Sequence, residues 1–508
     1  MTTAGRRRRR AVRVVVLVVA VAAAAGCGAR LDPAQHAAGV HLAAPHVGVA
    51  GPGATDAVGS AVVGPAAPTG PANTQAAGGP GLLVTPTGAV STGGPVTPNG
   101  PVPATAGPGT TRSSASTGTH ASGGCASGTL AASDVGVTPT TVTINNSADL
   151  TGPVPGLFQT AQDGVMAFVA YFNGTGQSVC GRRLALTNLD SQSSESGDNA
   201  AATNACANAF AMVGGDSAFD QGGAPVVAKC GIPDIRSTVN SVQRGAVDNV
   251  VAASSDDLHW FEPSIGAIFA QKFGDKVTQH AAIAYINVGV GQQQAQRYKA
   301  GFESQGWKVP DLLPIDVSDF SYDPFVQKMK GDGIDFVFFI AAEAQYARMV
   351  QSFQAQRFTP DVFLMNPNGY DSVYTQAAGA AAKGSYVYID SVPFFEAASS
   401  PELQLYLTWL GRVAPNAEPS WFGELAWSAA RLFVTVAEQV GPNLTRKAFV
   451  TKLRQVAAWT SNGLTAPQPI GAKTTGSCWA ILQWDGSTWT RASAAPYTCT
   501  PAALKVSY

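Results

Sequence analysis

Residue types that commonly carry out catalysis or bind metals are scarce in this chain of 508 residues. Four of its six histidines lie in the first 120 residues, which leaves His259 and His280 for the rest. There is no Cys-x-x-Cys pair, His-Glu-x-x-His motif or phosphate-binding loop, and Gly215-Asp216-Ser217-Ala218-Phe219 lacks the last glycine of a hydrolase elbow. We therefore expect no metal, no cofactor and no enzymatic activity, with acid–base chemistry by two carboxylates as the remaining catalytic alternative.

Aromatic residues divide the chain into two unequal parts. The sequence has 22 Phe, 12 Tyr and 9 Trp, and the first of them is Phe158. A segment without large apolar side chains cannot build an ordinary core, so the folded part is the C-terminal two-thirds. Residues 1–133 contain eight arginines and two aspartates, and the remainder has 24 basic and 31 acidic residues. An acidic folded part argues against nucleic acid as a partner.

The first 26 residues read as an export signal. Arg6–Arg10 and Arg13 precede a run of twelve apolar residues, Val14–Ala25. A helix of that length spans about 18 Å, which is too short for a bilayer core, so the run is typical of a secretory signal peptide. Ala24-Ala25-Gly26-Cys27 resembles a bacterial lipobox, which implies lipidation of Cys27 and anchoring on the outer face of the cell membrane. An ordinary signal peptide, with Cys27 incidental, is the alternative.

Residues 27–132 are rich in Gly, Ala, Pro, Thr, Ser and Val and carry few charges. No helical or strand periodicity persists there, and such a composition cannot bury enough surface to offset the entropy of ordering. We interpret the segment as a disordered tether, which would cross a cell-wall layer. Compositional drift without a function is the equally weighted alternative.

From residue 137 onward, predicted strands alternate with predicted helices. Strands are expected at 141–145, 184–189, 211–213, 233–236, 249–253, 281–288, 312–317, 335–342, 362–366, 386–389, 478–484 and 488–492. Helices are expected at 160–172, 196–210, 221–230, 263–273, 291–305, 324–330, 343–356, 402–413, 421–440 and 445–457. This alternation predicts an α/β fold with two doubly wound parallel sheets, and ligands in such folds bind at the carboxyl ends of the strands. Asp485-Gly486 predicts a hairpin between the last two strands.

Several segments together resemble a known family. They are Thr143-Ile144 with Asp149–Pro153, Ala167–Asn173 with Cys180–Arg183, Val213–Ser217, Gly231–Pro233, and Gly306-Trp307 with Asp319-Phe320. Their order and spacing resemble type I periplasmic substrate-binding proteins of ABC transporters, of the Leu/Ile/Val-binding or amide-binding kind. The resemblance runs from about Val137 to the C-terminus. It implies two lobes, 137–254 plus 391–462 and 255–390 plus 463–508, joined by a hinge and separated by a ligand cleft.

The resemblance also implies which residues bind the ligand. In the first lobe these are Thr151, Gly152, Ser217, Ala218, Ser237 and Thr238, and in the second lobe Asn287, Glu343 and Asn368; Trp421 would cover the ligand. Each serine or threonine could instead be a helix N-cap, Glu343 a first-turn acid and Trp421 a core residue. The turn Asn366-Pro367-Asn368-Gly369 lacks the acidic group that amino-acid-binding members carry, which favours a neutral amide, a polyol or another small polar solute.

Six cysteines follow Cys27, and an even number in an exported chain favours disulfides. Cys478 and Cys499 flank the terminal hairpin and are expected to pair. Cys206 and Cys230 fall late in adjacent predicted helices, which leaves Cys125 for Cys180. Pairing of Cys180 with Cys206 is the main alternative.

The function that this implies is capture of a small polar solute (an amino acid, an amide or similar) by hinge closure, and its delivery to the permease subunits of an ABC importer. We expect a monomer, held to the membrane by its lipid anchor. A lipoprotein that senses a ligand and signals to a receptor is the first alternative, and a structural cell-wall protein with a degenerate cleft is the second.

Overall fold

The computed structural model describes Cys125 and residues 130–254 and 258–508. The predicted signal peptide (1–26), the predicted lipidation site Cys27 and nearly all of the predicted tether (27–132) lie outside the described residues. No helix in the described part is both long and apolar enough to cross a membrane.

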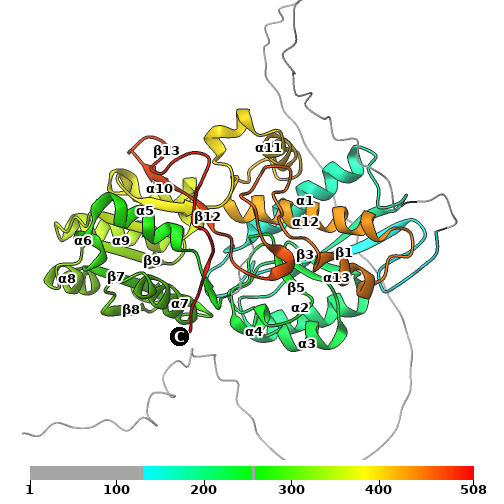
Figure 1. Ribbon diagram of the computed structural model, residues 1–508, viewed down its shortest axis with the longest axis horizontal. Helices are drawn as coiled ribbons and strands as arrows, with labels where there is room; N and C mark the ends of the chain where they lie inside the picture. Colours follow the sequence, from blue (N-terminus) through cyan, green and yellow to red (C-terminus); the bar gives the residue numbers. More distant parts are fainter. Residues whose placement is uncertain (1–124, 126–129, 255–257) are drawn as a thin grey trace, which may run out of the picture. The chain divides into compact units, whose positions relative to one another are not determined.

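Five parallel strands form the first sheet, in the order β2-β1-β3-β4-β5 (Figure 1). They are β1 (Thr141–Ala148), β2 (Arg183–Asp190), β3 (Ala211–Val213), β4 (Asp234–Arg236) and β5 (Val250–Ala252). Thr141 of β1 aligns with Arg183 of β2, and β1 pairs with β3 on its other side. The three short strands β3, β4 and β5 are buried along their whole length, as expected for a parallel sheet covered on both faces.

Helices from two distant parts of the chain cover this sheet, and together with it they form what we call the first lobe. They are α1 (Gln159–Gly174), α2 (Glu195–Asn208), α3 (Ala224–Cys230), α4 (Val242–Gly245), α11 (Pro401–Val413), α12 (Trp421–Val440) and α13 (Arg446–Leu453). Helix α12 packs so closely against α1 that a Cβ atom on Gly164 would lie 2.3 Å from the carbonyl oxygen of Gly423. Ser420 caps α12 by accepting a hydrogen bond from the N–H of Gly423.

The second sheet has the order β13-β12-β11-β10-β9-β7-β8. Its parallel part comprises β7 (Ala281–Ile286), β8 (Asp311–Ile315), β9 (Phe336–Ile340), β10 (Val362–Met365) and β11 (Tyr386–Ile389). The predicted hairpin, β12 (Cys478–Trp484) and β13 (Trp489–Arg491), adds two antiparallel strands beside β11, and β14 (Thr498–Cys499) pairs with β12. Strand β9 is fully buried and entirely apolar, which places it in the middle of the core.

This second sheet and its helices form what we call the second lobe. The helices are α5 (Pro263–Phe273), α6 (Asp275–Thr278), α7 (Gly291–Ser304), α8 (Asp323–Gly331), α9 (Glu343–Ala355) and α10 (Ser372–Ala378). Short 3₁₀ turns are η2 (Pro367–Gly369), η3 (Gly379–Ala382), η4 (Phe394–Ser399) and η5 (Ile470–Ala472). A small separate ribbon joins β6 (Trp260–Phe261) to β15 (Leu504–Lys505).

Two doubly wound sheets confirm the predicted α/β class. The sequence patterns missed only short elements, namely α4, α6, α10, β6, β14, β15 and the 3₁₀ turns. Helix α3 begins at Ala224 rather than at the predicted Gln221, because the preceding residues form turns.

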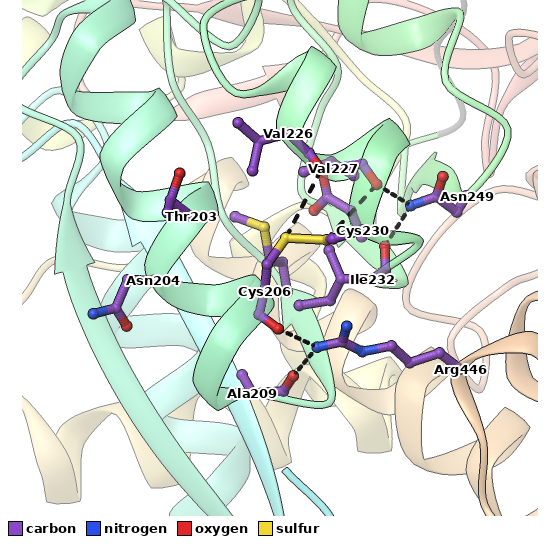
Figure 2. Close-up of a disulfide and its surroundings, with 12 residues drawn as sticks. Thr203, Asn204, Cys206, Ala209, Val226, Val227, Cys230, Ile232, Asn249 and Arg446 are labelled. Atoms are coloured by element: carbon purple, nitrogen blue, oxygen red, sulfur yellow. Dashed lines mark hydrogen bonds between the residues drawn. A yellow bond between two sulfur atoms is a disulfide. The ribbon is translucent and has the colours of Figure 1, made fainter. Parts of the chain in front are cut away.

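Three disulfides close the described chain: Cys125–Cys180, Cys206–Cys230 and Cys478–Cys499. The alternative pairing of Cys180 with Cys206 is therefore not adopted. Figure 2 shows that Cys206–Cys230 joins the ends of α2 and α3. Beside it, Arg446 donates hydrogen bonds to the carbonyl oxygens of Cys206 (2.9 Å) and Ala209 (2.5 Å), which ties the end of α2 to the start of α13.

Candidate functional site

A cavity of about 160 Å³ is lined by residues that follow strands of both sheets. In the first lobe, Ala218 follows β3 and Thr238 follows β4. In the second lobe, Ala342 follows β9 and Asn368 follows β10. The cavity thus occupies the place where doubly wound sheets bind ligands, at the carboxyl ends of their strands.

Aromatic side chains from both lobes make up much of the wall. In the first lobe the Phe158 and Phe422 rings meet edge to face, with their centroids 4.8 Å apart, and the Trp421 ring lies 5.3 Å from that of Phe422. In the second lobe the Tyr388 and Trp479 rings lie 5.2 Å apart. The remaining wall is divided about equally between aliphatic and polar residues. The larger aliphatic ones are Val154, Leu157, Ile286, Val288, Val290 and Ile340. Such a surface favours a solute with a large apolar part.

Glu262 and Arg297 are the two lining residues with ionisable acid or base groups. They neutralise each other, because Arg297 Nη2 lies 2.6 Å from Glu262 Oε2 and both side chains are buried. The Tyr298 hydroxyl donates to the other carboxylate oxygen at 2.7 Å and lies 2.5 Å from the Tyr388 hydroxyl. The pair is therefore held inside the protein's own hydrogen-bond network and adds no net charge to the wall.

Behind the first-lobe wall, Asp149 gathers the hydrogen-bond donors nearest the end of β3. Its carboxylate accepts from the Ser191 hydroxyl at 2.5 Å, the Ser217 hydroxyl at 2.8 Å and the Ala218 N–H at 2.8 Å. Burial raises the pKa of Asp149, against the lowering effect of these bonds. The protein thus supplies its own carboxylate to a group of donors that could otherwise bind an anionic ligand.

Asp216, which follows β3, accepts hydrogen bonds in the same way from donors in the turn after β4. The Thr238 hydroxyl donates to its Oδ2 at 2.8 Å and the Asn240 amide donates to its Oδ1 at 2.5 Å. Burial raises the pKa of Asp216 to about 7, with Arg236 acting in the opposite direction. Thr238 and Asn240 line the cavity, but their polar hydrogens point to protein partners.

In the second lobe, the turn after β10 is fixed by internal bonds. The Asn368 amide donates to the carbonyl oxygen of Ala341 at 2.9 Å and to Glu343 Oε1 at 3.3 Å, and its own oxygen accepts from the Tyr346 hydroxyl at 3.0 Å. Burial raises the pKa of Glu343 to about 7. Gln345, a residue that is 8% exposed, differs from its neighbours because its Oε1 is buried and has no hydrogen-bond partner among the described residues.

Four of the ten residues that the sequence predicts to bind ligand line the cavity: Ala218, Thr238, Asn368 and Trp421. The other six do not. Ser217 and Ser237 are fully buried, and their hydroxyls donate to Asp149 and to the carbonyl oxygen of Gly214 (3.0 Å). These two hydroxyls hold the strand ends together instead of facing the cavity.

The remaining four predicted residues lie away from the cavity for different reasons. Thr151 is exposed and donates to Asp190 at 2.6 Å, and Gly152 packs against Ser193 in the turn after β2. Asn287 is exposed and does not line the cavity, although its neighbours Ile286 and Val288 do. Glu343 lies behind Asn368.

A family model described as periplasmic binding protein matches residues 141–488. The chain belongs to this family. Among solved structures, a leucine-binding protein from Thermotoga maritima aligns with a TM-score of 0.58 and 14% identity, over 69% of this chain and 98% of that one. A fatty acid ABC transporter substrate-binding protein from Thermomonospora curvata aligns with a TM-score of 0.59 and 15% identity, over 73% and 94%.

A solute-binding protein of an ABC transporter from R. palustris, in complex with benzoate, aligns with a TM-score of 0.58 and 15% identity, over 71% of this chain and 98% of that one. At these identities the structural likeness shows the fold, a type I periplasmic binding protein. No curated protein sequence matches the chain. Across Cys125, 130–254 and 258–508, no cluster of three or more His, Cys, Asp or Glu side chains could hold a metal ion.

Hydrogen bonds join the two lobes of this periplasmic binding protein along one edge of its cavity. The Val290 N–H donates to the carbonyl oxygen of Ala218 at 3.1 Å, and the Gln294 amide donates to that of Asn240, also at 3.1 Å. The Gln293 side chain accepts from the Val242 N–H at 2.9 Å. The strand ends of both lobes are therefore in direct contact around the cavity.

Asp390, directly after β11, connects the segments that pass between the lobes. Its Oδ2 accepts from the Ser254 hydroxyl at 2.8 Å and from the Gln468 amide at 2.9 Å. Its Oδ1 accepts from the Trp421 indole N–H at 2.8 Å, so the same carboxylate also holds the cavity wall. Asp390 is fully buried, and burial raises its pKa to about 6.

Sequence reasoning missed Asp390, Gln345 and the Glu262–Arg297 pair. Asp390 stands in the predicted crossing near Ser391, and a carboxylate directly after a buried strand is a local signal that could have identified it. Glu262 and Arg297 are 35 positions apart, and nothing local links them. Gln345 carries no sequence signal beyond its position in the first turn after β9.

Proposed function

We propose that the chain is an extracytoplasmic solute-binding protein that captures a small organic solute between its lobes and delivers it to an ABC importer. The observation that carries this proposal is the cavity shared by the two lobes, which lies at the carboxyl ends of both sheets. Opening and closing about the connecting segments is the motion by which such two-lobed proteins take up ligand.

The proposed lobes are 137–254 plus 391–462 and 255–390 plus 463–508. Helices α11, α12 and α13 lie with the first sheet although they follow the whole second set of parallel strands, and β12 pairs with β11 of the second sheet. The three crossings of this arrangement fall near Ser254, near Ser391 and between 460 and 478. Asp390 is bonded to residues of the first and third crossings, which supports a hinge at this place.

The proposed location is the outer face of the cell membrane, with Cys27 as the lipidated residue and residues 27–132 as the tether. The motif Ala24-Ala25-Gly26-Cys27 supports lipidation. A Cys27→Ala variant should move from the membrane fraction to the soluble exported fraction. Unchanged fractionation would contradict the anchor and favour an ordinary signal peptide.

The class of cargo is supported by the proteins of similar structure. By their descriptions they bind leucine, fatty acids or benzoate, all of which are small organic molecules. A thermal-shift screen of the exported chain should therefore include amino acids, amides, polyols, aromatic acids and fatty acids. A ligand present at 100 times its dissociation constant stabilises the folded state by about 2.7 kcal/mol.

The screen is made specific by two variants. Trp421→Ala removes a cavity wall and should reduce or abolish the shift, whereas Phe320→Ala changes a side chain that is 90% exposed and outside the cavity, and should keep it. Equal loss in both variants would contradict binding in the cavity. For a solute that binds, uptake by cells with and without the chain tests transport, and unchanged uptake would favour a sensing role.

A further inference from the structure

We infer that the solute is uncharged and mainly apolar, with one hydrogen-bonding group such as an amide or an alcohol, and that free amino acids and carboxylates are not its natural ligands. This inference rests on the proposed function and names the chemical class of its cargo. It narrows the range of small polar solutes that the sequence suggests.

The first step is the charge of the wall. Glu262 and Arg297 are the ionisable acid and base on the lining, and they form a buried pair at 2.6 Å. A charged solute would have to separate this pair or enter without a counter-charge. Burying an unpaired ionised group is costly, and breaking a buried pair is strongly unfavourable.

The second step is the state of the donors in the first lobe. The Ser217 hydroxyl and the Ala218 N–H both bond to Asp149, and the Thr238 hydroxyl bonds to Asp216. A carboxylate placed at these strand ends would find its donors already used and two acidic side chains close behind them. The arrangement therefore opposes an anionic group on electrostatic grounds as well as for lack of donors.

The third step is the polar capacity that is left in the second lobe. Asn368 is fully engaged with Ala341, Glu343 and Tyr346. Gln345 lines the cavity, is 8% exposed, and has a carbonyl oxygen without a partner among the described residues. A buried amide oxygen of this kind is stabilised by one N–H or O–H donor, and a neutral solute can bring that donor without a charge.

The fourth step is the apolar part. Phe158, Trp421 and Phe422 form one wall, and Tyr388 and Trp479 belong to the opposite lobe. The Trp421 indole N–H is bonded to Asp390 and that of Trp479 to the carbonyl oxygen of Gly476. These rings therefore offer the solute faces and edges rather than hydrogen bonds, which suits an aromatic or branched aliphatic group.

The test uses probes of nearly equal shape and different charge, titrated into the exported chain at pH 7.5 by calorimetry. One series is benzamide, benzoate and benzylamine, and the other is isovaleramide, isovalerate and leucine. We expect the amide of a series to bind at least about tenfold more tightly than its charged partners, because they must be buried without a counter-charge. Tightest binding by benzoate, isovalerate, benzylamine or leucine would overturn the inference and leave the proposed function standing.

A variant pair tests the assigned contact. Gln345→Leu should weaken amide binding about tenfold through loss of one buried hydrogen bond, and Gln354→Leu, an exposed position on the same helix α9, should leave it unchanged. Equal binding by Gln345→Leu and the unaltered chain would overturn the role of Gln345. If none of the six probes binds to the folded chain, the inference is wrong, and the broad solute screen then decides the proposed function separately.

Discussion

Replacement of Asp390 by Asn should change how the free energy of unfolding depends on pH. The pKa of Asp390 is about 6 in the folded protein, against about 3.9 for an aspartate in an unfolded chain. The folded state thus binds the proton more tightly than the unfolded chain does. The contribution of Asp390 to the free energy of unfolding is therefore fully present well below pH 4 and is lost as the pH rises through 6. The difference of about two pKa units corresponds to about 3 kcal/mol.

The measurement is urea unfolding, followed by tryptophan fluorescence, at pH 4 and pH 7.5. The stability of the unaltered chain relative to Asp390→Asn should fall by about 2.4 kcal/mol between these pH values, since Asn cannot ionise and part of the full difference is already lost at pH 4. The exposed Asp316→Asn serves as a matched control and should run parallel to the unaltered chain. Parallel curves for Asp390→Asn would refute the reasoning, because they would mean that the buried carboxylate is not the group that loses its proton.

Two further predictions concern packing and cross-linking. Gly164→Ala should destabilise the fold by about 1–3 kcal/mol, because the added Cβ would lie 2.3 Å from the carbonyl oxygen of Gly423. The control is Gly411→Ala on helix α11, where the added Cβ meets no atom within 4 Å. In thermal unfolding this control should be neutral or slightly stabilising. Equal melting temperatures would contradict the close α1–α12 contact. Converting both Cys206 and Cys230 to Ser should lower the free energy of unfolding by about 3 kcal/mol, since the disulfide closes a loop across a separation of 24 residues. An unchanged melting temperature would contradict a stabilising role of this disulfide.

The sheets could be predicted from the sequence because their signals are local. A strand such as Phe336–Ile340 is continuously apolar, and Asp485-Gly486 is a typical turn sequence that predicts the hairpin at 478–491. The ribbon of β6 and β15 could not be predicted, since it pairs two-residue segments more than 240 positions apart. No local periodicity exists in so short a strand.

The site could be predicted only as a location. Thr238 and Asn368 line the cavity because the carboxyl ends of parallel strands come together. Ser217 occupies an equivalent place in the chain but faces Asp149, which is 68 positions away. Which of these side chains lines the cavity, and which of their donors are already bonded within the protein, depends on such distant partners, and the spacing of residues along the chain does not contain that information.

The same distant partners explain how the cavity keeps its shape. Asp149 and Asp390 each take donors from separate segments of the chain, and Asp216 takes its donors from the turn after β4, so each buried carboxylate fixes a strand end. Of the three, Asp390 alone is bonded both to a residue on the cavity wall, Trp421, and to Gln468 in the third crossing. A solute that moves the Trp421 indole must therefore strain or release a bond of Asp390, and under the proposed function this bond would link binding in the cavity to movement about the proposed hinge.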